Sequence, residues 1–144
     1  MTFQDGELVD WVVFNRARGE LGTGFVRILG YFREDGVKSV AAIEDAMRNL
    51  NATALVMPAH TLKGESRQFG AEPLAALSEK IEMVARRCVE AHESPDELIE
   101  DVVRLRPLFN ATLTLFDREA SPVGQRRPLA FGRKAPGGFG LAQR

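Results

Sequence analysis

Residues 59–82, AHTLKGESRQFGAEPLAALSEKIE, decide the fold and contain one of the two histidines of the chain. From just before this segment, small and apolar residues recur at steps of three and four, as on the buried face of a helix: Leu55, Ala59, Leu62, Ser66 and Phe69. A second stripe, more than about 90° away around the same helix, carries His60, Lys63, Gly64 and Arg67. We therefore predict a two-faced helix whose open face presents an imidazole, two cations and a glycine.

The same helical spacing continues on both sides of this segment. No part of the chain alternates with the period of two that a half-buried strand needs. Helices are expected at residues 6–17, 20–50 (with Gly36 as a candidate break), 52–69, 73–91 and 95–118. Because short connections favour antiparallel neighbours, the predicted fold is all-α. It is an antiparallel four-helix bundle with an extra short N-terminal helix and an irregular C-terminal tail.

Two helix boundaries carry signals that the structure can test. Ser94 and Glu97 have the spacing of a capping box, and Pro95 between them suits a first helical position. Pro58 falls inside the helix predicted at 52–69. It either removes a backbone hydrogen bond and bends that helix, or it marks the true start of the helix.

The chain is expected to have a helical bundle at residues 1–118 and a tail at residues 119–144. The tail is rich in Gly, Pro and Arg and has no apolar stripe, so it lacks a core of its own. From residue 120 onward there are five basic residues and no acidic ones, which leaves 14 basic and 20 acidic residues before it. The bundle is therefore acidic and the tail basic.

Composition narrows the class of protein. With 44% hydrophobic and 27% charged residues, the 144-residue chain suits a globular domain, and a net charge of −1 gives no indication of a nucleic-acid partner. A single cysteine excludes a disulfide within the chain. The first 30 residues include several acidic ones and no long apolar run, which argues against a signal peptide or membrane anchor. We expect a cytoplasmic monomer that binds neither nucleic acid nor membrane.

The stripe around His60 suits a nucleophile that receives an anionic group. A neutral imidazole nitrogen is a good nucleophile near neutral pH, because the ordinary pKa of the side chain is about 6.5. Lys63, one turn away, can act as a point charge toward anionic oxygens. Gly64 lies mid-helix, where glycine costs about 0.5–1 kcal/mol relative to alanine, and it leaves room beside the ring. A solvated surface histidine is the alternative interpretation of the same stripe.

The segment resembles the signature of histidine-containing phosphotransfer (HPt) domains of bacterial-type two-component phosphorelays. The matching positions are His60, Leu62, Lys63, Gly64, Phe69, Gly70, Leu74, Leu77 and Glu82. The resemblance extends more weakly over residues 18–116 and leaves out the tail. It implies a four-helix bundle whose exposed histidine accepts a phosphoryl group from a receiver-domain aspartate and passes it to another response regulator. The implied partners are receiver domains of response regulators and hybrid histidine kinases.

The resemblance also implies roles for single residues. His60 would be the phosphoacceptor, with Lys63 assisting the phosphate and Gly64 allowing the partner to approach. Glu82 would lie close to the histidine. From its spacing alone, Arg86 lies one turn further along the same helix and is a candidate supporting residue, although most such pairs are solvated surface ions. Arg67 departs from the family, which usually has a small residue there. It either strengthens the phosphoryl site or obstructs the usual partner, and an outward contact with the clustered carboxylates of a receiver is the more natural role.

The chain lacks the other parts of a kinase. It has no GxxxxGK[ST] loop, no Gly-rich nucleotide motif and no carboxylate cluster spaced for Mg²⁺. We expect a phosphocarrier without a cofactor of its own, whose partner receiver domain supplies the Mg²⁺. His92 is expected to cap the end of the helix at 73–91, and Cys88 to lie in the core. Two histidines and one cysteine do not make a zinc site.

Two other functions stay open at this stage. One is the dimerisation module of a histidine kinase, although these kinases usually have an acidic residue after the histidine and Thr61 follows it here. The other is an HPt-like adaptor that binds partners without phosphorylation, an alternative that the unusual Arg67 keeps open. Acid-labile label on His60 after incubation with phosphorylated receiver domains would distinguish these functions.

Overall fold

The computed structural model describes residues 8–120, so nearly all of the predicted tail lies outside the described residues, as does the start of the helix predicted at 6–17. Within residues 8–120 the chain forms α-helices and two short 3₁₀-helices, and no strand. In chain order the elements are α2 (Trp11–Leu21), η1 (Gly22–Gly24), α3 (Phe25–Arg48), α4 (Ala52–Gln68), α5 (Glu72–Ala91), η2 (Asp96–Leu98) and α6 (Ile99–Ala120).

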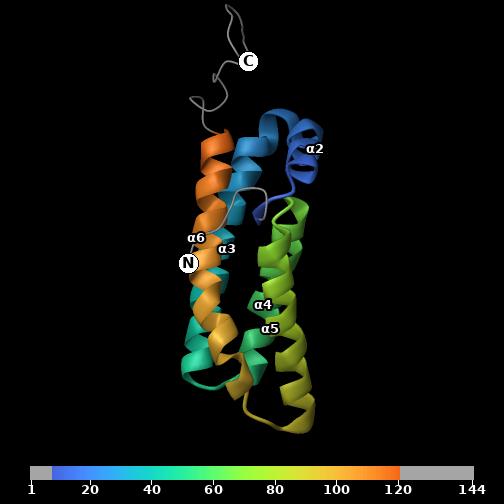
Figure 1. Ribbon diagram of the computed structural model, residues 1–144. Helices are drawn as coiled ribbons and strands as arrows, with labels where there is room; N and C mark the ends of the chain where they lie inside the picture. Colours follow the sequence, from blue (N-terminus) through green and yellow to red (C-terminus); the bar gives the residue numbers. More distant parts are fainter. Residues whose placement is uncertain (1–7, 121–144) are drawn as a thin grey trace, which may run out of the picture. The chain divides into compact units, whose positions relative to one another are not determined.

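The chain divides into two units, Met1–Leu113 and Thr114–Arg144. In the first unit α3, α4, α5 and the part of α6 up to Leu113 run alternately up and down (Figure 1). The prediction of an all-α antiparallel four-helix bundle with an extra short helix, α2, before it is confirmed. The described part of the second unit, residues 114–120, forms the last turns of α6. The division predicted at residue 118 stays a prediction.

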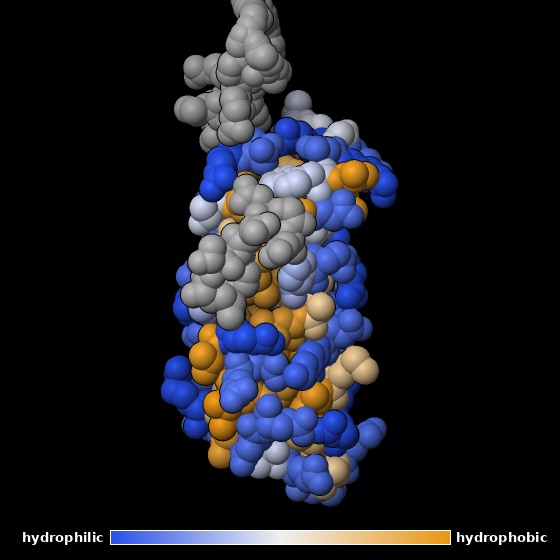
Figure 2. Space-filling view, in the orientation of Figure 1, coloured by the Kyte–Doolittle hydropathy of each residue, from blue (hydrophilic) through white to orange (hydrophobic). Residues whose placement is uncertain are grey.

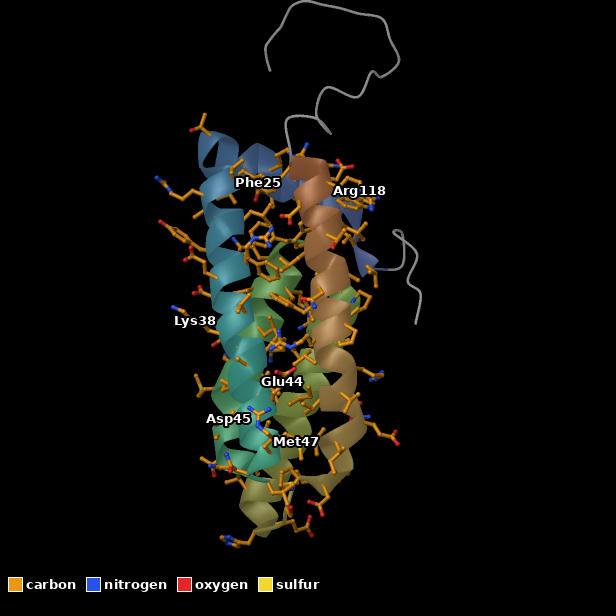
Figure 3. The ribbon with its side chains drawn as sticks, turned by 90° about the vertical axis from the view of Figure 1, so that its left-hand side faces the viewer. Phe25, Lys38, Glu44, Asp45, Met47 and Arg118 are labelled. Atoms are coloured by element: carbon orange, nitrogen blue, oxygen red, sulfur yellow. The ribbon has the colours of Figure 1, made fainter. Side chains whose placement is uncertain are left out.

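Ion pairs link neighbouring helices of the first unit. Arg106 on α6 donates two hydrogen bonds to Glu44 on α3, at 2.8 and 2.9 Å. Figure 3 looks onto these two helices and labels Glu44 on α3. Lys80 on α5 contacts Asp101 on α6 at 3.2 Å, and Asp101 is buried. These contacts show that α6 lies next to both α3 and α5.

The core follows the stripe that the sequence predicts. The side of α4 that carries Leu55, Ala59, Leu62 and Ser66 is fully buried, and Phe69 at its end is 1% exposed. Phe69 makes edge-to-face contacts with Phe25 and Phe32 of α3, which bury large apolar area in the centre of the unit. In Figure 2 hydrophilic residues cover most of the visible face, with hydrophobic surface along its middle.

Gly36, the candidate break in the sequence, lies inside a continuous α3 and does not break it. The reason for a glycine there is packing against α6. A Cβ atom at Gly36 would lie 2.6 Å from Cζ of Phe109, which is too close for a carbon contact. The glycine therefore lets the Phe109 ring lie directly against the backbone of α3.

The start of α4 and the end of α5 also answer the boundary predictions. The side chain of Asn51 accepts a hydrogen bond from the Ala54 N–H at 3.1 Å, so α4 begins before Pro58, which is accommodated inside the helix. His92 ends α5 in a left-handed conformation, with φ at 56°, and its backbone N–H donates to the carbonyls of Cys88 and Val89. His92 is thus at the end of the helix, as expected.

The predicted capping box at Ser94 and Glu97 does not form. Pro95 precedes η2 without a side-chain cap, the Ser94 hydroxyl donates to Asp96, and Glu97 is engaged by Arg87 on α5. The side chains of Ser94 and Glu97 therefore contact other side chains, and neither caps the backbone of the other residue. Among residues 8–120 no helix is both long enough and apolar enough to span a membrane.

Candidate functional site

A nearly buried carboxylate on α5, Glu82, is the centre of the candidate site. Its side chain is 6% exposed, and it contacts three side chains from the two helices α4 and α5. Nδ1 of His60 lies 3.0 Å from Oε2, and Nζ of Lys63 lies 2.9 Å from Oε1. Nε and Nη2 of Arg86 lie 2.9 and 2.8 Å from Oε2. The structure therefore brings His60, Lys63, Glu82 and Arg86 together.

The helix geometry explains why these residues meet. His60 and Lys63 are three residues apart on α4, so both lie on the side of that helix next to α5. Glu82 and Arg86 are four residues apart and share one side of α5. Since the turn between Gln68 and Glu72 reverses the chain, these two sides face each other.

The surroundings of Glu82 keep it ionised. Burial alone would raise its pKa, but the contacts from Lys63, Arg86 and His60 outweigh burial and lower the pKa to about 2. An ionised carboxylate can only accept hydrogen bonds, so Nδ1 of His60 must carry the hydrogen of the contact between them. In a neutral ring the lone pair is then on Nε2.

The other edge of the His60 ring is accessible. The side chain is 50% exposed, and among residues 8–120 its hydrogen bonding is confined to Nδ1. Gly64, one turn further along α4, is exposed, and a Cβ atom there would meet nothing within 4 Å. Packing among the described residues therefore does not require a glycine at this position. The missing side chain leaves open space on the surface that His60 shares.

Arg67 lies on the predicted exposed side of α4 but takes part in a separate set of contacts. Its Nη2 lies 3.1 Å from Oε1 of Glu79, and its Nε lies 3.5 Å from Oε1 of Glu72, both on α5. The hydrogen bond from Arg67 to Glu79 is the largest influence on the Arg67 pKa and raises it. The structure therefore does not group Arg67 with Glu82.

The sequence analysis missed Glu72 and Glu79 as parts of this surface. A signal was present, because Glu79 and Glu82 are three residues apart and Glu72 is two turns before Glu79 on the same helix. That spacing places all three acids on one side of α5. The register of α5 against α4, which decides which acid meets which base, is not contained in that spacing.

The remaining candidate residues, Cys88 and His92, do not belong to this cluster. Cys88 is 1% exposed, as predicted for a core residue. His92 lines an open hollow of about 580 Å³ at the other end of α5, together with the turn between α3 and α4. Within the described residues there is no group of three or more His, Cys, Asp or Glu side chains that could hold a metal ion.

Comparisons with known proteins bear on the fold and the family of the chain. The chain is similar to a solved crystal structure, that of histidine-containing phosphotransfer protein B (HptB) from Pseudomonas aeruginosa PAO1, with a TM-score of 0.67 and 24% identity. The likeness covers 83% of this chain and 96% of that one, and at this identity it shows the fold alone. No match was found among curated proteins. The family model of the Hpt domain matches residues 27–115, which include every residue of the cluster. Because this match spans more than half of the chain, the chain belongs to the Hpt domain family.

Proposed function

We propose that the chain is a phosphocarrier in which His60 accepts a phosphoryl group from the aspartate of one receiver domain and passes it to that of another response regulator. Histidine phosphotransfer in phosphorelays is the general function of the family to which the chain belongs. One observation carries the finer proposal. The ionised Glu82 binds Nδ1 of His60 at 3.0 Å and leaves the lone pair of the half-exposed ring on Nε2.

The transfer step can be written on these atoms. The Nε2 lone pair forms a bond to phosphorus while the bond from phosphorus to the aspartyl oxygen breaks, and its electron pair leaves on the aspartate carboxylate. The hydrogen on Nδ1 stays in place, so the phosphorylated ring carries a positive charge next to the Glu82 carboxylate. Glu82 stabilises that charge, as a carboxylate does for an imidazolium. The reverse sequence on a second receiver returns the ring to its neutral form.

Lys63 and Arg86 supply charge for the phosphoryl oxygens. Both contact Glu82, so two cations share one carboxylate and one net positive charge remains beside His60. Arg86 is 53% exposed, so an incoming anion can reach its guanidinium. The chain needs no cofactor in this proposal, because the receiver domain brings the Mg²⁺ that its own aspartate requires. We propose receiver domains of response regulators and hybrid kinases as partners, with the chain a cytoplasmic monomer.

The decisive experiment starts from a receiver domain phosphorylated with ³²P in the presence of Mg²⁺. The full chain should take up label that is lost in acid and kept in alkali, as expected for phosphohistidine. His60→Gln should take up none, whereas His92→Gln should take up as much as the unchanged chain. Receiver binding without any label on the unchanged chain would overturn the carrier and favour the adaptor.

A further inference from the structure

The surface around His60 contains two sets of charged side chains of opposite sign. The first set, Lys63, Arg86 and Glu82, leaves one net positive charge. The second set consists of Arg67 with Glu72 and Glu79, so it leaves one net negative charge. The sequence alone suggested a single basic stripe along α4. The contacts with α5 divide this stripe into a positive part beside His60 and a negative part next to the α4–α5 turn.

The two sets are close enough for one docked surface to meet both. Lys63 and Arg67 are four residues apart on α4, which corresponds to roughly 6 Å along the helix axis. Salt screens solvent-exposed charges over about 8 Å at physiological ionic strength, so a partner meets both signs of charge within that distance. Gly64 lies between the two sets and presents no side chain, so a docked surface can reach both of them.

Arg67 is occupied, while the two glutamates keep accepting capacity. Its guanidinium is directed to Oε1 of Glu79 and Oε1 of Glu72. Among residues 8–120 the second carboxylate oxygen of each glutamate has no ion pair or hydrogen bond, and the two side chains are 40% and 53% exposed. A carboxylate accepts up to about four hydrogen bonds. The second set can therefore accept a further cation.

We propose that Glu72 and Glu79 form a docking point for a lysine or arginine of the receiver domain that exchanges phosphate with His60. This inference rests on the proposed function. The acidic phosphorylation site of a receiver fits over the positive set at Lys63 and Arg86, and the negative set would repel the same acidic site. A basic residue of the receiver opposite Glu79 gives one orientation in which both sets are matched. Arg67 contacts both glutamates and lowers the net negative charge of the set.

The test uses one receiver domain that labels His60 of the unchanged chain, and measures its Kd by calorimetry and its transfer rate. Glu79→Lys should weaken binding by roughly five-fold or more, and more strongly at low salt, because it reverses a charge at the rim of the interface. Glu79→Gln should have a smaller effect in the same direction. The matched control is Glu34→Lys, which makes the same charge change at an exposed position of α3 and should change Kd by less than about two-fold.

Two further variants distinguish the glutamates from Arg67 as the partner's contact. Arg67→Ala uncovers both carboxylates, so it should keep the receiver affinity or increase it, whereas a direct Arg67 contact requires a loss. Each Lys and Arg of the receiver is then changed to Glu, and one of these variants should recover affinity when it is combined with Glu79→Lys. Far-ultraviolet circular dichroism and Tm of each variant confirm that the bundle is retained.

The outcomes separate the inference from the proposed function. If the unchanged chain is labelled but Glu79→Lys binds the receiver as well as Glu34→Lys does, the docking point at Glu72 and Glu79 is wrong and the carrier stands. A loss of affinity in Arg67→Ala would also overturn it. Absence of label on the unchanged chain with every receiver tested would overturn the carrier itself.

Discussion

Glu82 on α5 accepts a hydrogen bond from Nδ1 of His60 on α4 at 3.0 Å, across the seam between two antiparallel helices. The two residues are 22 positions apart in the chain, and the contact links the only histidine of α4 to a carboxylate whose side chain is 6% exposed. This contact gives the imidazole a defined orientation and a defined position for its hydrogen. It is the feature on which the reactivity of Nε2 depends.

Replacing Glu82 by Gln should slow phosphoryl transfer while preserving the bundle. The amide has the shape of the carboxylate but no charge, so it supports the positive phosphorylated ring less well. A hydrogen bond to a charged group contributes about 1.5–3 kcal/mol, which corresponds to a loss of roughly ten-fold or more in rate. Single-turnover transfer from a labelled receiver measures it. Glu90→Gln, at an exposed position of the same helix, is the control and should transfer at the unchanged rate.

The same residue should make the bundle sensitive to acid. The pKa of Glu82 is about 2 in the folded chain and is ordinarily near 4.5. A lowered pKa contributes stability that is fully present above about pH 4.5 and is lost as the pH falls toward 2. The contribution is on the order of 3 kcal/mol, since each pKa unit corresponds to about 1.4 kcal/mol. Urea unfolding between pH 2 and 6 should therefore show a steep fall, and the fall should be shallower in Glu82→Gln. Equal slopes in the two proteins would contradict the ionised, clamped carboxylate.

The carboxyl group of Glu65 should lower the stability of the bundle as the pH rises, the opposite of the effect of Glu82. Burial and the charge of Asp35 raise the pKa of Glu65 from about 4.5 to about 7. The unfolded chain then loses its proton first, so this group lowers the stability as the pH rises from about 4.5 to 7. Glu65→Gln should remove this loss and stabilise the chain at pH 8, by on the order of 1 kcal/mol or more. The comparison needs urea midpoints at pH 5 and pH 8. A midpoint difference between the two pH values as large as in the unchanged chain would refute the raised pKa.

Much of the fold and part of the site could be predicted from residue spacing. The steps of three and four located the helices within a few residues, because the buried stripe of α4 depends only on helix periodicity. That Glu82 lies close to His60 came from a family resemblance, since residues on different helices meet only once the register of α4 against α5 is set. For the same reason the partners of Arg67 were not predicted. Glu97 was assigned to a cap because the competing Arg87 comes from a helix whose position is not a local property.

Gly36 shows the same limit. A glycine in mid-helix raises the same expectation wherever it occurs, namely a weak point or a space for a partner. Which of these applies depends on what the fold places against it. At Gly36 the fold places the ring of Phe109, and at Gly64 it places nothing within 4 Å of a Cβ atom. We therefore expect the same substitution to change the stability of the bundle in opposite directions at the two glycines.

Gly36→Ala should destabilise the bundle, whereas Gly64→Ala should stabilise it. The new methyl group at Gly36 would overlap Phe109, and overpacking in a core costs about 1–3 kcal/mol. At Gly64 alanine meets open space and improves helix propensity, which is worth up to about 1 kcal/mol. Urea unfolding at pH 7 measures both. Stabilisation of the chain by Gly36→Ala would contradict the close contact between α3 and α6.

A larger side chain at position 64 should slow phosphoryl transfer without lowering the stability of the bundle. Gly64→Gln should retain a Tm at or above that of the unchanged chain, because glutamine is also a better helix former than glycine. Its side chain would occupy the space beside His60 that a receiver domain needs, so the transfer rate should fall by about ten-fold or more, as expected when a close approach is lost. Gly30→Gln, in α3, is the matched control, since a Cβ atom there also meets nothing within 4 Å. It should gain stability in the same way and leave transfer unchanged. An equal transfer rate in the Gly64 and Gly30 variants would show that Gly64 does not serve the approach of the partner.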